Sequence, residues 1–309
     1  MKLLTYTIKD ESKLGALWQD DQVVNLQSAL LAYQNAHPNA AKLNYPNDML
    51  SLIQNWDQLM PEVRTAFDWL THSKDAVLLK GATHSLSQVE IEAPLSNPSK
   101  VVCVGLNYRD HCLDHHLPIP ERPLLFSKFP SSITGPYGDV CWSNATSKNV
   151  DYEAELAIVI KKTCRNVRPE EALEYVAGYS VLNDISARDV QFADVQWVRG
   201  KSFDTFCPYG PYLVTADEVP DPQRLPIRLL LNDQVMQDSN TSQMIFPCDE
   251  IISYISQTST LHPGDLIATG TPNGCGAARE PQVYLHDGDR LVVEIENIGR
   301  IENIMREVN

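Results

Sequence analysis

Two glutamates begin a run of residues that alternates as a β-strand does and is otherwise apolar. Residues 151–160 read DYEAELAIVI. Because alternate residues of a strand share a face, Glu153 and Glu155 point the same way. Buried carboxylates are very costly without a counter-charge, and oxygen donors suit a hard divalent cation. The pattern indicates a metal site, while a solvated strand end with both side chains in water explains it equally well.

A third carboxylate follows another apolar run. Residues 179–189 read YSVLNDISARD, and Asp184 comes directly after the apolar part. At the end of a strand, Asp184 could complete a three-carboxylate site with Glu153 and Glu155. Taken alone, an Asn–Asp pair is more often a turn or a helix cap, so that alternative stays open.

Histidines cluster in residues 107–116, which read NYRDHCLDHH and follow an apolar run. If this segment is helical, His111 and Asp114 lie at positions i and i+3 on one face. A carboxylate beside an imidazole fixes its tautomer and favours its protonated form, as a general acid or base requires. The alternatives are a transition-metal site and, more common for such a segment, surface histidines on a polar loop.

A lysine and a glycine-rich loop add two further candidates. Lys201 lies among aromatic and small residues in WVRGKSFD, where its ammonium could stabilise developing negative charge; an exposed loop lysine is the simpler alternative. Residues 269–276, TGTPNGCG, could cradle a carboxylate with backbone amides and the Thr271 hydroxyl, or form a plain tight turn. The loop lacks the lysine of a phosphate-binding P-loop, and the chain has no dinucleotide-binding glycine motif.

Short strands and helices must position these residues. Residues 1–95 predict opening strands and three helices, with Pro61 in the first turn of the third, and none of them suggests chemistry. Residues 96–309 predict a second, β-rich domain of short strands between Gly, Pro and Asp turns, which favours a sandwich or roll. The strands expected there are 101–104, 153–160, 176–182, 212–214, 227–231, 266–269 and 291–296, with helices at 170–175 and 249–257.

Composition excludes several classes of protein. The chain has 309 residues, 43% of them hydrophobic, which suits one large or two ordinary domains. Its net charge of −15 makes nucleic acid and membrane surfaces poor partners. Seven scattered cysteines indicate reduced thiols, and the amino terminus lacks the features of a leader peptide. We therefore expect a cytoplasmic protein with a small-molecule substrate.

The order of six sequence blocks is more specific than any single motif. They read VGLNYRDH, PLLFSKFPSSITGP, VDYEAELAIVI, AGYSVLNDISARDVQ, GKSFDTFCPYGP and LHPGDLIATGTPNGCG. Over roughly residues 100–309 this order resembles the fumarylacetoacetate hydrolase (FAH) superfamily, in particular its FAH-domain-containing proteins associated with oxaloacetate tautomerisation. The resemblance implies an α+β, β-rich fold, a mixed β-sandwich roll with a small N-terminal α/β cap domain. It also implies a homodimer.

The resemblance assigns a role to each matched residue. Glu153, Glu155 and Asp184 match ligands of Mg²⁺ or Mn²⁺. The other matches are Lys201 behind the metal, Arg188 and Gln191 toward the substrate, Thr271 with Gly270 and Gly274 in the GTPxG loop, and His111 as the mobile acid or base. One position departs from the pattern, because Asp114 stands where the family usually has Glu. The shorter side chain retracts the carboxylate by about 1.5 Å, which bears on water activation more than on proton transfer.

The implied function is that of an enzyme acting on a small anionic 2-oxo acid through a metal-stabilised enolate. Protonation of the enolate at carbon would tautomerise oxaloacetate, and this is the leading expectation. Loss of a carboxylate would make the protein an oxaloacetate decarboxylase. Attack by activated water would make it a C–C hydrolase of acylpyruvate or fumarylacetoacetate-like diketo acids. An inactive metal-stabilised scaffold is least favoured, since the ligands, Lys201 and His111 are all present.

Overall fold

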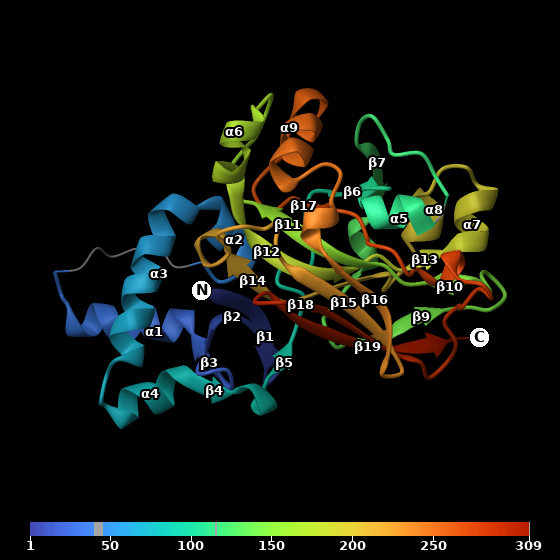
Figure 1. The fold of residues 1–309 in the computed structure, drawn as a ribbon. Helices are drawn as coiled ribbons and strands as arrows, with labels where there is room; N and C mark the ends of the chain where they lie inside the picture. Colours follow the sequence, from blue (N-terminus) through green and yellow to red (C-terminus); the bar gives the residue numbers. More distant parts are fainter. Residues whose placement is uncertain (40–45, 115, 309) are drawn as a thin grey trace.

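A computed structural model describes residues 1–39, 46–114 and 116–308, and a large mixed sheet runs through its centre (Figure 1). The sheet has twelve strands within the described residues. They are β1 (Lys2–Ile8), β2 (Glu11–Trp18), β3 (Gln22–Asn25), β4 (Thr83–Ser85), β5 (Glu90–Ile91), β6 (Val101–Gly105), β7 (Leu124–Lys128), β8 (Ile133–Thr134), β11 (Ala154–Ile160), β12 (Val176–Asn183), β14 (Cys207–Thr215) and β17 (Leu266–Ala268). The strand order is β4-β3-β2-β1-β14-β12-β11-β17-β6-β7, with β5 beside β1 and β8 beside β14.

A second sheet packs against one face of this central sheet. Its strands are β9 (Val140–Trp142), β15 (Pro226–Leu231), β16 (Gln234–Asn240), β18 (Arg290–Ile295) and β19 (Gly299–Glu307), in the order β16-β15-β18-β19-β9. The two faces share one apolar core, in which Leu156 and Ile158 of β11 lie with Val293 and Ile301. A short ribbon of β10 (Val150–Asp151) and β13 (Ser186–Ala187) lies apart from both sheets. The predicted β-rich sandwich roll is therefore confirmed.

Helices of the N-terminal segment cover the opposite face. They are α1 (Leu26–Ala36), α2 (Met49–Gln54), α3 (Trp56–Thr71) and α4 (Ala76–Ala82). Val63 of α3 shares a core with Ala157 and Val159 of β11, because alternate residues of that strand point to opposite faces. Strand β1 pairs with β14, so the central sheet continues across the expected domain boundary. The division into residues 1–95 and 96–309 stays a prediction.

One helix begins earlier than its sequence signal. The expected start of the third N-terminal helix at Pro61 is wrong, because α3 begins at Trp56 and carries Pro61 inside it. Leu59 and Met60 are buried on the same helix as Val63, so the apolar stripe extends past the proline. Burial of these side chains outweighs the single backbone hydrogen bond that proline cannot donate.

Three short helices gather at the end of the sheet opposite α1, α3 and α4 (Figure 1). They are α5 (Arg109–Asp114), α7 (Arg188–Ala193) and α8 (Val198–Lys201). Two others, α9 (Cys248–Thr258) and α6 (Pro169–Ala172) with its following turn of 3₁₀-helix, lie where sequence pattern predicts helices.

Strand β14 is much longer than the predicted 212–214. The prediction missed its start because Pro208 and Gly210 are residue types that argue against a strand. No helix in the described residues is long and apolar enough to cross a membrane.

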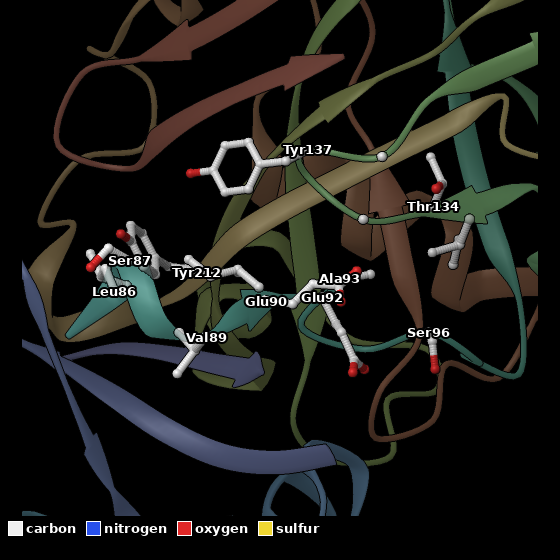
Figure 2. A pocket seen from close by; sticks show the side chains of 14 residues that line it. Leu86, Ser87, Val89, Glu90, Glu92, Ala93, Ser96, Thr134, Tyr137 and Tyr212 are labelled. Carbon is white, nitrogen blue, oxygen red and sulfur yellow. The ribbon is translucent and has the colours of Figure 1, made fainter. Parts of the chain in front are cut away.

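A hollow of about 880 Å³ lies where the N-terminal segment meets the rest of the chain (Figure 2). Residues 86–96 line one side, with Glu90 and Glu92 among them, and residues 133–138 line the other with Tyr137. None of the predicted site residues lines this hollow. Predicted site residues lie instead at the end of the sheet where α5, α7 and α8 gather, since these helices carry His111, Arg188 and Lys201.

Candidate active site

The three predicted carboxylates meet at one end of β11 and β12. One oxygen each from Glu153, Glu155 and Asp184 lies within 4.8 Å of the others. Their exposed fractions are 6%, 1% and 0%, so the alternative of a solvated strand end is wrong. Strand β12 runs to Asn183, and Asp184 follows directly at the strand end rather than in a surface turn.

The backbone around this cluster is tied together by the strand pairing. The Asp184 amide donates to the Glu153 carbonyl at 2.9 Å. The Glu153 amide donates in turn to Asn183 Oδ1 at 3.0 Å. Both carboxylate-bearing segments are therefore held at the ends of two interior strands of the sheet, which is the rigid support that a precise site requires.

Two buried lysines hold Asp184 from both sides. Lys201 Nζ lies 2.8 Å from Asp184 Oδ2 and 2.8 Å from Glu153 Oε2. Lys128, the last residue of β7, donates from Nζ to Asp184 Oδ1 at 2.6 Å and to the Ile185 carbonyl at 3.1 Å. Sequence reasoning missed Lys128. The sequence shows only that Lys128 ends the strand-like run PLLFSK. Many surface lysines also end a strand, so this position does not indicate a buried ion pair.

Arg188 extends the ion-pair network to the other side of Glu153. Its Nη2 lies 2.7 Å from Glu153 Oε1 and 2.7 Å from Asp151 Oδ2. Its Nη1 donates to Gln191 Oε1, one turn further along α7, at 3.1 Å. The two predicted substrate-binding side chains are thus adjacent, and Arg188 is already bound to two carboxylates.

Asp151 connects Arg188 to the glycine-rich loop, and sequence reasoning did not select it. It is fully buried and accepts hydrogen bonds from the amides of Gly276 at 2.8 Å and Ala277 at 3.1 Å. It also accepts from Arg188 Nε at 2.9 Å. A Cβ on Gly276 would lie 1.8 Å from the Val283 carbonyl oxygen, so only glycine allows this approach. The only sequence signal was an acidic residue two positions before Glu153.

The buried charges do not balance. Four carboxylates, Asp151, Glu153, Glu155 and Asp184, face three lysine and arginine cations, Lys128, Arg188 and Lys201. His111 is a further titratable group beside Glu153, and with its imidazole neutral and all four carboxylates ionised, one negative charge is in excess. The excess falls on Glu155, whose Oε2 accepts from the Gly270 amide at 2.7 Å and which forms no ion pair within the described residues. Burial and the neighbouring Asp184 and Glu153 carboxylates raise its pKa well above the usual value. Burial also opposes ionisation of Glu153, but Lys201 and Arg188 lower its pKa overall.

This donor set fits a hard divalent cation. Three buried carboxylates supply the oxygen ligands that Mg²⁺ and Mn²⁺ prefer, and their spacing lets one ion reach all three. An added cation would also compensate the charge that lacks a partner at Glu155. The cluster could therefore hold a metal.

His111 and Asp114 lie in the helix that their spacing predicts, α5, but they border different hollows. His111 is buried and lines a small cavity with Glu153, and its Nδ1 lies 4.0 Å from Cys275 Sγ. Asp114 lines the neighbouring, more open hollow, and its Oδ2 accepts from the Gly274 amide at 3.1 Å. A role for Asp114 in orienting His111 stays a prediction.

The glycine-rich loop differs in part from the expected carboxylate cradle. Gly270 and Gly274 have φ values of 96° and 95°, which favour glycine. Their amides donate to Glu155 and Asp114, so the loop braces the protein's own carboxylates. Thr271 lines the cavity, and its hydroxyl accepts from Gln237 Nε2 at 2.9 Å.

A cavity of about 130 Å³ brings most of the predicted site residues together. Its polar lining consists of His111, Glu153, Glu155, Arg188, Gln191, Lys201 and Thr271. Its apolar lining includes Leu106, Leu117, Phe126, Phe192 and Trp197. Asp184 is not among the lining residues and is bound to both lysines.

The two-sheet roll carries a buried carboxylate cluster that could hold a divalent metal beside a small cavity, which is the arrangement of an enzyme site for a small molecule. The family model described as fumarylacetoacetate (FAA) hydrolase C-terminal matches residues 100–306. The chain belongs to this family, as the order of its sequence blocks predicted.

Relatives with assigned names agree with this membership. "Oxaloacetate tautomerase FAHD2A, mitochondrial" of Bos taurus is 49% identical over 219 residues, 70% of this chain and 69% of that protein. "Oxaloacetate tautomerase YisK" of Bacillus subtilis (strain 168) is 35% identical over 307 residues, 98% of this chain and 99% of that protein. Among solved structures, maleylpyruvate hydrolase from Sphingobium sp. SYK-6 in complex with manganese(II) ion and pyruvate has a TM-score of 0.77. It is 30% identical, and the match covers 100% of both chains.

Proposed function

We propose that this protein catalyses keto–enol tautomerisation of oxaloacetate with Mg²⁺ or Mn²⁺ held by Glu153, Glu155 and Asp184. The observation that carries the proposal is the buried carboxylate cluster, with its excess negative charge, beside a cavity of only about 130 Å³. Relatives named oxaloacetate tautomerase, one of them matching nearly the whole chain, support this substrate. A small cavity suits a four-carbon acid.

The metal and the protein have separate tasks in this proposal. A bound divalent ion supplies a Lewis acid that stabilises negative charge developing on the keto oxygen of a 2-oxo acid. Lys201 holds Glu153 and Asp184 in place and adds a buried positive charge beside them. Arg188, Gln191 and the Thr271 hydroxyl offer donors to the polar groups of the substrate, and the amide of Gly270 keeps Glu155 oriented.

Proton transfer is assigned to His111. Its imidazole borders the cavity, so it can take a proton from C3 of the keto form to leave the enolate, or give one to C3 of the enolate. The proton on the enol oxygen is exchanged with solvent water. Asp114 acts beside His111 as a positioning residue. Its carboxylate connects α5, the helix that carries His111, to the Gly274 amide.

Hydrolysis of a C–C bond in acylpyruvate or fumarylacetoacetate-like diketo acids is the second candidate. The neighbour named maleylpyruvate hydrolase favours it. Hydrolysis requires an activated water, however, and the carboxylate of Asp114 lines the outer hollow rather than the cavity of His111. Tautomerisation needs no such water, and decarboxylation of oxaloacetate needs only that a carboxylate leave the same bound acid.

One assay separates these reactions. The decay of enol-oxaloacetate is followed by ultraviolet absorbance with Mg²⁺ and with EDTA, while pyruvate is measured in the same sample. Metal-dependent loss of the enol without pyruvate supports tautomerisation, and pyruvate appearing in step supports decarboxylation. If neither changes, oxaloacetate is not the substrate and acylpyruvates are tested next. An inactive scaffold would bind the metal and turn over none of them.

Assembly and location belong to the proposal as well. A homodimer is expected from the family resemblance, and sedimentation equilibrium would measure it directly. The cytoplasmic location stays a prediction, and the bovine relative, whose name includes "mitochondrial", does not support it. Fractionation of cells that produce the full-length protein would decide the location.

A further inference from the structure

The apolar lining of the cavity includes Trp197, whose ring lies against a glycine. A Cβ on Gly105, the last residue of β6, would lie 2.6 Å from Trp197 Cζ3 and 3.1 Å from Cη2. Gly105 has no positive φ, so its backbone conformation does not require glycine. The glycine is needed for space: any larger residue there would displace the indole.

Phe126 of β7 holds the same indole from another direction. The two rings meet edge to face with centroids 5.2 Å apart. Lys201 Nζ lies 5.1 Å from the centroid of the Phe126 ring, so the aromatic pair is adjacent to the polar lining of the cavity. Such packing limits movement of the indole, because Trp197 cannot shift toward Gly105 or Phe126 without a clash.

The size of the cavity makes the position of Trp197 important. Its volume of about 130 Å³ is well below the roughly 300–1,000 Å³ of pockets that hold drug-sized ligands. If a 2-oxo acid binds to the polar lining residues, a substituent on its C3 atom must fit beside the apolar ones. An apolar surface would attract a hydrocarbon substituent, so only lack of space could exclude one.

We propose that Trp197, seated on Gly105 against Phe126, is a specificity-determining residue that limits the cavity to short 2-oxo acids and excludes those with bulky C3 substituents. The inference rests on the proposed function in taking a 2-oxo acid as the ligand. It goes beyond that function in assigning the size limit to one side chain and to the glycine beneath it.

The test measures binding rather than turnover. The probes are pyruvate, 2-oxopentanoate and 2-oxo-4-phenylbutanoate. Each has a single keto group besides its carboxylate and so offers no bond for the C–C hydrolysis of a diketo acid. Their affinities for the Mn²⁺-loaded protein are measured by calorimetry. We expect the wild-type protein to bind the phenyl compound at least tenfold more weakly than pyruvate. Trp197→Leu should remove most of this difference while the affinity for pyruvate changes less than threefold.

Two further variants make the test specific. Gly105→Ala pushes the indole into the cavity and should weaken binding of 2-oxopentanoate at least fivefold, and the double variant Gly105→Ala/Trp197→Leu should restore it. Trp69→Leu makes the same substitution at a half-buried tryptophan in α3 and should leave all three affinities unchanged. Melting temperature and Mn²⁺ affinity establish that each variant is folded, and Trp197→Phe replaces Trp197→Leu if the latter is not.

The outcomes for the two proposals are separable. An unchanged affinity profile in the folded Trp197 variants, or a Gly105→Ala variant that binds every probe normally, overturns the size limit even if oxaloacetate is tautomerised. Conversely, a wider profile in Trp197→Leu establishes the size limit even if the wild-type protein fails to tautomerise oxaloacetate.

Discussion

Buried carboxylates lie at both ends of the paired strands β11 and β17, and they differ in whether a positively charged side chain pairs with them. At one end Glu155 borders a cavity and has no ion-pair partner within the described residues. At the other end Asp265 is fully buried just before β17. Asp265 accepts from the Ser99 hydroxyl, the Lys100 ammonium and the amide of His262. One carboxylate is fully satisfied, whereas the other carries the excess charge of its cluster.

The difference separates a structural role from a functional one. A buried carboxylate that contributes only to stability needs a counter-charge and hydrogen-bond donors, and Asp265 has both. Retaining a fourth carboxylate against three cations raises the free energy of the folded state unless something else binds there. The excess at Glu155 is therefore the physical mark of a site built for a cation.

Glu155→Gln should abolish metal binding and activity without destabilising the protein. The amide keeps the shape of the side chain and its acceptor for the Gly270 amide, while the excess negative charge is removed. Calorimetric titration with Mn²⁺ should show no binding, and the metal-free melting temperature should be unchanged or higher. Normal Mn²⁺ affinity in this variant would contradict the assignment of the site.

Lys201→Met should reduce kcat by about 10²–10³-fold while Mn²⁺ binding persists, because the ammonium stabilises charge and is not itself a metal ligand. Removing a cation that lies 2.8 Å from Glu153 and 2.8 Å from Asp184 leaves two carboxylates free to bind metal more strongly. Steady-state kinetics at saturating Mn²⁺ and calorimetry check the two parts separately. Loss of metal binding would instead make Lys201 a purely structural residue.

Asp151→Asn should act through Arg188 and weaken substrate binding. The substitution removes the charge that orients the guanidinium of Arg188. It also leaves one side-chain oxygen, which can accept from the amide of Gly276 or of Ala277 but not from both as the two oxygens of Asp151 do. We expect KM to rise by about 10- to 100-fold, the usual cost of losing a residue that orients a functional group, with a smaller change in kcat. Mn²⁺ affinity within threefold of wild type is the control. A fall in kcat alone would contradict this positioning role.

Asp265→Asn provides the contrast at the other end of the strands. It should lower the free energy of unfolding by about 1–3 kcal/mol, the cost of an imperfectly satisfied buried group. Denaturant unfolding measures this loss, and kcat and KM below the unfolding transition should match wild type. If activity falls while stability is unchanged, the proposed division between the two ends is wrong.

The local sequence singled out residues that depend on strand alternation but left their role open, and the resemblance to the family indicated the metal. Glu153 and Glu155 share a face because strand geometry is periodic, and Asp184 could be recognised because it ends an apolar strand. Lys128 and Trp197 could not be found in this way. Lys128 reaches Asp184 from 56 residues away in sequence, and Trp197 is defined by its contact with Gly105. These partners come together only when β6 and β7 join the sheet.

By itself, the sequence determined the β-rich class of the fold through local periodicity and the family through the order of its motifs, and that family resemblance selected the three carboxylates as a set. The tertiary structure decided which charges have partners and which side chains limit the cavity. Charge compensation and volume are properties of space rather than of sequence distance. The excess charge at Glu155 and the packing of Trp197 on Gly105 therefore exist only in the folded chain.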